Sequence, residues 1–464
     1  MQSPAPAGVA PPARADGLPD GLPIPRRYQA IAALLAAITM TVLDGGIANL
    51  ALPSISEALG VSAAGSVWIV TAYQLALVAL VFPFAALAER SGLRQVFSAG
   101  VALFTLASLA CALAPTLGWL VAARALQGVG AAAIMCASAG IVRNTYPRAQ
   151  LGRGIGINAL CVAIGSAAAP TLGAALLTWA GWPWLFAINL PFGLLTLALA
   201  RAIPEGPRAP RRIDGLSVLL NAGLFCLGIT GLERIAEQPL LSLGLITIAT
   251  LCLFGLLRRE RGNPTPLLPL DLLEHTLFRH AMLGSLCLFS SQMLCFIALP
   301  FYLQHQLGLS AMHTGLLMMA WPLTVAVAAQ WSGRLADRHP PQALCVFGGL
   351  AIALGAACAA LWPLADQPSL VVLFMAISGF GFGFFQVPNN RVLLTSTPLH
   401  RDGATGGMQA TARQTGMAAG SAVIALLLGI TPEHAPRIGL GLAAALAVAA
   451  ALVSTSAVKR RRAG

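Results

Sequence analysis

Charged residues are scarce in this sequence. Asp, Glu, Lys and Arg together make up 9% of its 464 residues, whereas 57% are hydrophobic. A soluble domain carries roughly 25% charged residues because it has a polar surface to cover, so an ordinary soluble enzyme is excluded. The high apolar content excludes a disordered chain, and the 47 glycines follow no three-residue period, which excludes collagen. This composition is typical of a polytopic membrane protein.

Lysine is nearly absent, and acids are few. Lys459 is the only lysine among 28 basic residues, which outnumber the 16 acids and leave a net charge of +12. Such an excess also occurs in nucleic-acid-binding proteins, but these bases occupy short gaps between apolar runs and form no basic soluble domain. We therefore expect no nucleic-acid partner and interpret the excess as a topology signal.

Motifs for metal binding and catalysis are also missing. None of the nine cysteines forms a CxxC pair and all lie in apolar runs, which predicts buried, unreactive thiols rather than disulfides or a zinc site. The sequence has no Walker motif, no nucleophile–base motif and no soluble domain large enough for ATP hydrolysis. We expect a protein that is not an enzyme and that holds no metal or cofactor.

Long apolar runs dominate the chain. A transmembrane helix needs about 20 mainly apolar residues, and the runs are continuous and rich in Leu and Ala, which favours helices over the short alternating strands of a barrel. By this measure fourteen spans are predicted, near residues 28–50, 66–88, 96–115, 118–141, 154–178, 184–203, 214–233, 238–257, 277–303, 311–333, 342–363, 368–390, 404–430 and 436–457.

The basic residues predict the orientation of these spans. All but four of the 28 lie at the chain ends or in one alternate set of gaps; Arg234 and Arg437 lie in the opposite gaps, and Arg124 and Arg413 lie inside spans. Lys and Arg collect in cytoplasmic loops. Both termini are therefore predicted to be cytoplasmic, in a multi-pass protein of a bacterial-type inner membrane.

A loop motif occurs twice. Residues 85–92, Ala-Ala-Leu-Ala-Glu-Arg-Ser-Gly, follow span two, and residues 333–338, Gly-Arg-Leu-Ala-Asp-Arg, follow span ten. An acid in such a loop can cap a helix or pair with an arginine in one conformation only, which predicts a conformational latch; the alternative is a solvated charge pair worth about 0–1 kcal/mol. The latch residues are Glu89, Arg90, Gly92, Asp337 and Arg338.

The repeat also predicts the domain organisation, because two similar halves around a central site are typical of transporters. The segments expected are a disordered cytoplasmic tail (1–27), a six-helix bundle (28–203), a linker with two extra helices (204–276), a second six-helix bundle (277–457) and a basic cytoplasmic tail (458–464).

One acid, Asp44, lies deep inside a predicted span, and Arg124 in the fourth span lies at a comparable depth in the outer half. A charge at membrane depth is costly without a partner or water, so a functional role is the default hypothesis; a structural ion pair that never titrates is the alternative. An arginine beside an acid favours the ionised acid, so movement of Arg124 would switch Asp44 between proton loading and release.

The fifth span contains Gly165, Pro170 and Gly173. Small residues on one face permit close helix packing, and a proline removes a backbone hydrogen bond and bends the helix. We expect a bend of this span at these residues.

These segments together resemble the major facilitator superfamily and, within it, the fourteen-span drug/proton antiporter group. The similarity extends in order over nearly the whole chain after residue 27. The matching stretches are Asp44…Asn49-Leu-Ala-Leu-Pro53, the two loop motifs, Arg124…Gln127-Gly128, Ala169-Pro170…Gly173, Trp184…Asn189-Leu-Pro191, Asp214-Gly215, Leu299-Pro-Phe-Tyr302-Leu-Gln304…Gly308 and Arg413-Gln414-Thr-Gly416…Gly420. The first loop departs from the family pattern at Ala85, Glu89 and Leu93, where glycine, aspartate and a base are usual.

The resemblance implies an all-α membrane protein of two six-helix bundles plus two extra central helices, which exports small organic compounds by alternating access. The compounds are expected to be amphiphilic or cationic, the proton is the coupling ion at Asp44 and Arg124, and the protein is a monomer in the lipid bilayer; participation of an adaptor in the cell envelope stays open. The residues expected to line the substrate cavity are Asn49, Tyr73, Gln74, Gln127, Asn158, Gln292, Trp321, Gln386, Asn389, Gln409 and Arg413.

Alternatives stay open at this point. Each of these cavity residues is equally explained by a hydrogen bond between helices. A dedicated exporter of one metabolite or self-made toxin would share every motif, and a membrane sensor or channel without coupled transport is a more distant alternative.

Overall fold

The computed structural model describes residues 21–147, 150–205, 214–235, 238–260, 270–336, 338–363, 367–396 and 402–463, and this part of the chain is helical without a strand. Its α-helices are α1 (Arg26–Leu59), α2 (Ala63–Ser91), α3 (Leu93–Ala112), α4 (Leu117–Thr145), α5 (Leu151–Trp179), α6 (Trp184–Ala187), α7 (Asn189–Leu199), α8 (Gly215–Glu233), α9 (Pro239–Glu260), α10 (Thr276–Phe301), α11 (Ala311–Met318), α12 (Ala320–Leu335), α13 (Pro341–Leu361), α14 (Leu370–Thr395), α15 (Asp402–Ile430) and α16 (Ala435–Ala463). Short helical turns, η2 (Ala200–Ala202), η3 (Leu270–Glu274) and η4 (Tyr302–Gln306), lie between them.

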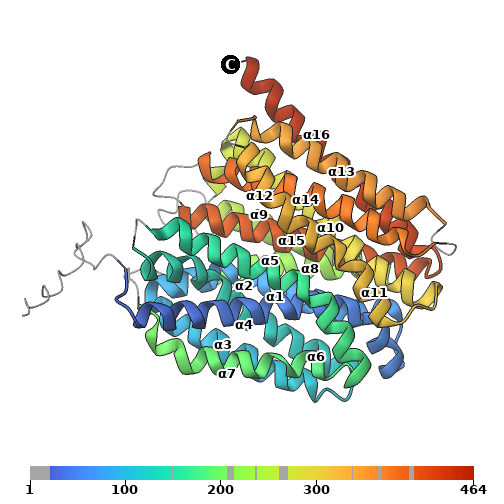
Figure 1. Cartoon of the computed structure of the whole chain (residues 1–464), viewed down its shortest axis with the longest axis horizontal. Helices are drawn as coiled ribbons and strands as arrows, with labels where there is room; N and C mark the ends of the chain where they lie inside the picture. Colours follow the sequence, from blue (N-terminus) through green and yellow to red (C-terminus); the bar gives the residue numbers. More distant parts are fainter. Residues whose placement is uncertain are drawn as a thin grey trace, which may run out of the picture.

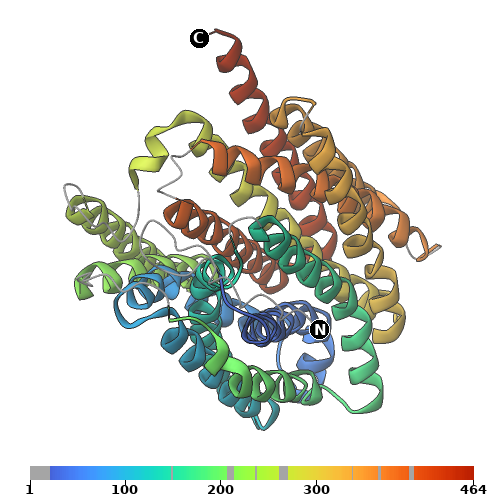
Figure 2. The same ribbon diagram turned by 60° about the vertical axis from the view of Figure 1, so that its left-hand side comes forward.

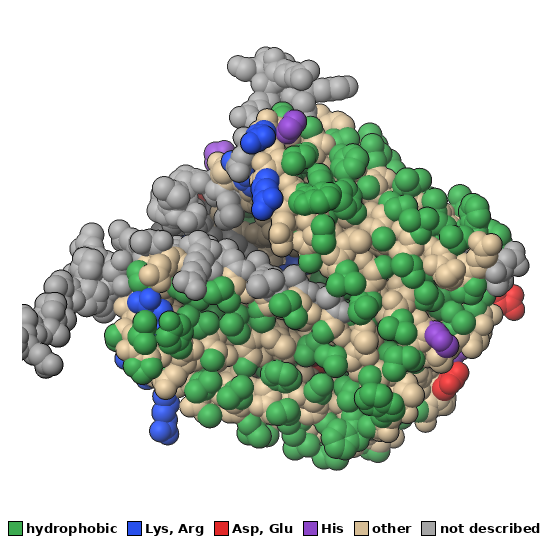
Figure 3. Space-filling model, viewed as in Figure 1, with side chains coloured by type: hydrophobic (Ala, Val, Ile, Leu, Met, Phe, Trp, Pro, Cys, Tyr) green, Lys and Arg blue, Asp and Glu red, His purple; other side chains and the backbone are tan. Residues whose placement is uncertain are grey.

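Within the described residues, thirteen helical segments are long and apolar enough to cross a membrane. Three of them join consecutive elements, because α6 to η2, α10 with η4, and α11 with α12 each form one segment. The helix α5 is not among the thirteen, although it has 29 residues. Figure 3 shows apolar side chains spread over the visible face, with basic side chains toward the left and top of the view and acidic side chains toward the right. Thirteen of the fourteen predicted spans are thus candidate membrane spans in the structure. The remaining one, predicted near residues 154–178, corresponds to α5.

Most helix contacts lie within the first part or within the last part of the chain. In the first part, α2 packs on α4, α3 on α4, and α1 on α5 and α7. In the last part, α13 packs on α14 and α16, α12 on α14, and α10 on α15 and α16. Figure 1 shows the blue to green helices mainly in the lower part of the view and the yellow to red helices mainly in the upper part. The two parts meet where α2 packs on α15, α5 on α11 and α1 on α10.

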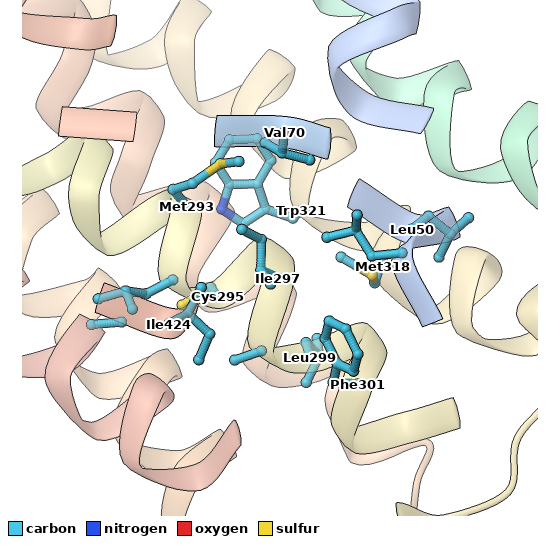
Figure 4. Close-up of a cluster of buried hydrophobic side chains, with 14 of the residues drawn as sticks. Leu50, Val70, Met293, Cys295, Ile297, Leu299, Phe301, Met318, Trp321 and Ile424 are labelled. Carbon is cyan, nitrogen blue, oxygen red and sulfur yellow. The ribbon is translucent and has the colours of Figure 1, made fainter. Parts of the chain in front are cut away.

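Two apolar clusters join the parts. Figure 4 shows the larger one, in which Val70 of α2 lies near Met293 of α10 and Trp321 of α12, and Leu50 of α1 lies near Met318 of α11. Beside it, Gln304 Nε2 donates to the carbonyl oxygen of Leu50 at 3.2 Å. The smaller cluster combines side chains of α2, α9, η3, α10, α14 and α15, namely Val81, Phe82, Leu256, Leu272, Phe278, Ala281, Val392, Leu393 and Met408.

The helices α8 and α9 pack on each other, and α8 contacts both α2 and α15. The side chain of Asn221 is buried and donates to the carbonyl oxygen of Ala79 at 2.8 Å, which fixes α8 on α2. Figure 2 shows the pair at the outer edge of the molecule. At its end, a hydrogen bond from Arg259 holds the pKa of Asp214, the N-cap of α8, below its ordinary value. The pair therefore bridges the two parts from outside.

The beginning of the chain differs from the prediction. Residues 21–27 were expected to belong to a disordered tail, but the amide of Leu22 donates to the Thr145 carbonyl at 3.0 Å and the Leu22 side chain is buried. Arg26 and Arg27 begin α1, and Arg27 Nε bonds the Leu22 carbonyl at 2.8 Å. These contacts with α4 give the segment a fixed position; the rest of the predicted tail, residues 1–20, lies outside the described residues.

Candidate functional site

Asp44 lies near the middle of the 34-residue helix α1, and only 1% of its surface is exposed. Two glycines follow it, and a Cβ at Gly46 would lie 2.6 Å from the Cβ of Ala169, so α1 and α5 are in close contact here. A carboxylate in such a position needs donors or a cation, because burial of an unpaired charge is costly.

Arg124 of α4 supplies the cation. One of its terminal nitrogens lies 2.5 Å from Oδ2 of Asp44, and its Nε donates to the Ile69 carbonyl at 3.0 Å. The side chain is 1% exposed. Its guanidinium carbon is 4.4 Å from the ring centre of Tyr73 and 5.6 Å from that of Phe186, within the range of cation–π attraction.

The close approach of α4 to α2 depends on Gly128. A Cβ at this position would overlap the Tyr73 carbonyl oxygen and would lie 3.0 Å from the Ala76 side chain. The absence of a side chain at Gly128 therefore lets Arg124, one helical turn earlier, reach the Ile69 carbonyl and the face of Tyr73.

Three further polar side chains complete the cluster. Gln127 Nε2 donates to Asp44 Oδ1 at 2.8 Å and to Ser108 Oγ at 2.8 Å, while Gln127 Oε1 accepts from Arg124 at 2.6 Å. Asn189 Nδ2 donates to Asp44 Oδ1 at 3.0 Å. All are buried, and together they join α1, α3, α4 and α7 around one carboxylate.

This arrangement stabilises Asp44 as an ionised carboxylate. Every partner of the Asp44 oxygens in the described structure is a donor: Arg124 at Oδ2, and Gln127 and Asn189 at Oδ1. Protonation at Oδ2 would replace the ion pair with a neutral carboxyl and would leave Arg124 with Ile69, Gln127 and the aromatic rings. Asp44 therefore joins α1 to α4 and α7 through an ion pair and hydrogen bonds.

The predicted latch residues that the structure describes lie at helix ends. Glu89 and Arg90 are exposed at the end of α2, and Gly92, with φ of 106°, makes the turn into α3. Arg338 is exposed, while Asp337 lies outside the described residues. The structure also shows an ion pair that was not predicted, between Arg94 of α3 and Glu205 after η2. In the same place the Leu93 amide donates to the Glu205 carbonyl at 3.1 Å.

The predicted bend residues of α5 lie at helix contacts. A Cβ at Gly165 would lie 3.2 Å from Val42, and one at Gly173 would lie 3.2 Å from Ile47, so both glycines face α1. The carbonyl oxygen of Pro170 would be 2.7 Å from a Cβ at Gly315 of α11. This stretch of α5 therefore packs between α1 and the second part of the chain.

The predicted cavity residues do not form one cluster. Gln127 and Tyr73 belong to the Asp44 site, as described above. Gln74 of α2 contacts Met293 Sδ of α10 at 3.6 Å across the two parts. Asn389 donates to Ser285 Oγ at 2.7 Å, which joins α14 to α10.

The other predicted cavity residues have local or partial contacts. Asn49 donates to the Gly45 carbonyl of its own helix at 3.1 Å, and Trp321 packs against Phe296 and Phe382. Arg413 contacts the sulfur of Met135 at 3.6 Å, and the next residue, Gln414, contacts the same sulfur at 3.8 Å. Asn158, Gln292, Gln386 and Gln409 are half-buried.

Sequence reasoning missed two members of the site. Asn189 was noticed only as part of a family stretch at an interfacial turn, and its direct bond to Asp44 could have been suspected from that resemblance. Ser108 has no signal of its own, because it is one of many serines in apolar runs and only the packing of α3 on α4 brings it to Gln127.

Comparison with known proteins identifies the family. The model of the Major Facilitator Superfamily matches residues 34–421. "Uncharacterized transporter YebQ" of Escherichia coli (strain K12) is 42% identical over 94% of this chain and 96% of its own length. "Riboflavin transporter RibZ" of Clostridioides difficile (strain 630) is 30% identical over 83% of this chain and 84% of its own. The "Tetracenomycin C resistance and export protein" of Streptomyces glaucescens is 31% identical over 92% of this chain and 82% of its own.

The chain therefore belongs to the major facilitator superfamily, as its motifs predicted. It is a multi-pass membrane transporter and not an enzyme.

Proposed function

We propose that this major facilitator is a proton-coupled antiporter that exports small amphiphilic organic compounds. The observation that carries the proposal is the buried cluster of Asp44, Arg124, Gln127 and Asn189, because Asp44 is the one acid among the described residues that lies in the middle of a membrane helix. Relatives whose printed names include drug resistance and export support the direction of transport.

In this mechanism a proton enters at Oδ2 of Asp44 and breaks the ion pair with Arg124. The guanidinium keeps its bond to the Ile69 carbonyl, so α4 follows α2, while α1 loses the ion pair and keeps only the weaker hydrogen bonds from Gln127 and Asn189 to Oδ1. Loss of the proton on the opposite side restores the pair. The membrane potential contributes about 2.3 kcal/mol per charge per 100 mV to such a cycle.

The proposal includes the arrangement that alternating access requires. The helix α5 is the fourteenth span, two groups of six spans rock against each other, and α8 with α9 form the extra pair. Glu89, Arg90, Asp337 and Arg338 line the inner mouth as a latch beside Gly92. Both termini are cytoplasmic, the membrane is the inner membrane, and the protein works as a monomer with the proton as its only coupling ion and without a cofactor.

The test is transport by Asp44→Asn in proteoliposomes that contain a pH-sensitive dye. The wild type should release protons when a substrate is added and should accumulate the substrate along a pH gradient. Asp44→Asn is isosteric and keeps an oxygen for Gln127 and Asn189, so it should stay folded and lose both signals by at least tenfold. Glu57→Gln, a change of an exposed acid near the end of α1, serves as the control and should transport normally. Full gradient-driven transport by Asp44→Asn would refute the coupling role.

A second candidate is a transporter dedicated to one metabolite, which the printed name of the riboflavin transporter RibZ favours. A panel of unrelated drugs and of cell metabolites, assayed in the same vesicles, separates the two. Transport of a single compound from the panel would support the dedicated transporter.

A further inference from the structure

Arg413 is a second arginine at membrane depth. It lies on α15, which begins at Asp402, so about 16 Å of helix separates it from that end at 1.5 Å per residue. Its side chain is half-buried, and one of its terminal nitrogens lies 3.6 Å from Met135 Sδ of α4, the helix that also carries Arg124. Arg413 therefore lies where the second part of the chain packs against the first.

Unlike Arg124, Arg413 has no anionic partner in the described structure. Its terminal nitrogen has a methionine sulfur, Met135 Sδ, at 3.6 Å, and its buried Nε has no hydrogen-bond partner. A thioether is a weak acceptor. No carboxylate of the described residues lies within 4 Å of this guanidinium.

Among the described residues, no acid is placed to neutralise this charge. Asp44 already has Arg124, Gln127 and Asn189 as partners. The other described acids lie in short turns, between helices or within two residues of a helix end. A buried guanidinium without a counter-ion is costly, so binding of an anion here would be favoured.

The surroundings of Arg413 suit an anion with an apolar body. Met135 of α4 offers a polarizable apolar surface, Gln414 contacts the same sulfur at 3.8 Å, and Gln409 lies one turn before Arg413 on the same face of α15. The planar guanidinium matches carboxylate and sulfonate groups.

We propose that Arg413 binds the anionic group of the exported compound, and that the substrates are amphiphilic organic acids with a carboxylate or sulfonate on an apolar body. This inference rests on the proposed export function and replaces the cationic class that the family resemblance implies. Arg413 then has a role distinct from that of Arg124, whose guanidinium forms the ion pair with Asp44.

The test uses two fluorescent probes that share one scaffold. 1-Anilinonaphthalene-8-sulfonate has a sulfonate, and N-phenyl-1-naphthylamine is the same ring system without it. Binding of each is titrated to the full-length protein in nanodiscs of zwitterionic lipid, with empty nanodiscs subtracted and no proton gradient applied. The wild type should bind the sulfonate probe at least tenfold more tightly than the neutral probe.

Variants at Arg413 identify the cause of that preference. Arg413→Gln should weaken binding of the sulfonate probe by about tenfold to a hundredfold, because a charge-assisted hydrogen bond is lost. Its affinity for the neutral probe should stay within twofold of the wild-type affinity. Arg413→Lys keeps the charge and should give an intermediate affinity. Arg437→Gln is the matched control, because this arginine donates to the Tyr302 hydroxyl on the outer side and should bind both probes like the wild type.

Two outcomes would overturn the proposal: equal affinity of the wild type for both probes, or sulfonate binding by folded Arg413→Gln within twofold of the wild type. If Arg413→Gln yields no folded protein, the wild-type preference decides alone. Binding is measured without a gradient, so normal transport by Asp44→Asn would refute proton coupling without affecting this result. Conversely, if Arg413→Gln binds the sulfonate probe like the wild type, the anion-binding proposal fails and the coupling proposal stays intact.

Discussion

The ion pair of Asp44 and Arg124 predicts a non-additive effect on stability. Removal of one partner from a buried pair costs about 3–5 kcal/mol because it leaves the other charge uncompensated. In Arg124→Met the carboxylate keeps the two amide donors of Gln127 and Asn189, so we expect a cost near the lower end, about 3 kcal/mol. In Asp44→Asn, Arg124 keeps the Ile69 carbonyl and Gln127, and a similar cost is expected.

The double variant Asp44→Asn/Arg124→Met removes both charges together. Replacement of a buried pair by neutral residues is often neutral or stabilising, and the main loss is then the packing of the guanidinium on Tyr73. We expect the double variant to be within about 2 kcal/mol of the wild type, so that the coupling energy of the cycle is about 4 kcal/mol.

The assay is equilibrium unfolding in mixed micelles titrated with dodecyl sulfate and followed by tryptophan fluorescence. The matched control is the partly exposed pair of Arg94 and Glu205, for which the same cycle, Arg94→Met with Glu205→Gln, should give less than about 1 kcal/mol. A double variant as unstable as the sum of its two single variants would show that the buried charges do not depend on each other, and the reasoning would be wrong.

Two further predictions concern the same helices and the outer pair. Arg124→Lys should reduce gradient-driven export by about tenfold, because one ammonium group cannot reproduce the planar fork that reaches Asp44, Gln127 and the Ile69 carbonyl; wild-type export rates in vesicles would show that a point charge suffices. Single cysteines at Leu227 of α8 and Leu251 of α9, on a background without native thiols, should resist water-soluble thiol reagents and show no protection by substrate, because α8 and α9 bridge the two parts from outside. Substrate-protected labelling at either position would place the pair along the transport path.

The sequence alone determined the helical class, the family and the two buried charges. Continuous apolar runs permit few structures other than membrane helices, because a lipid-exposed backbone must satisfy its own hydrogen bonds. Asp44 stood out for a similar reason: an acid in the middle of a span is so costly that its position alone predicts a partner at the same depth, and Arg124 lies at that depth.

Only the tertiary structure decided which polar residues share the site. Gln127 was expected in the substrate cavity, and the structure shows it bonded to Asp44. Arg413 was grouped with the other cavity residues, and the structure shows its buried Nε without a hydrogen-bond partner. Ser108 and Asn189 join the site because α3 and α7 pack against α4 and α1. Hydropathy gives the depth of a residue in the membrane, but the neighbours of each helix and its rotation about its own axis depend on contacts between residues far apart in the chain, such as that of Gly128 with α2.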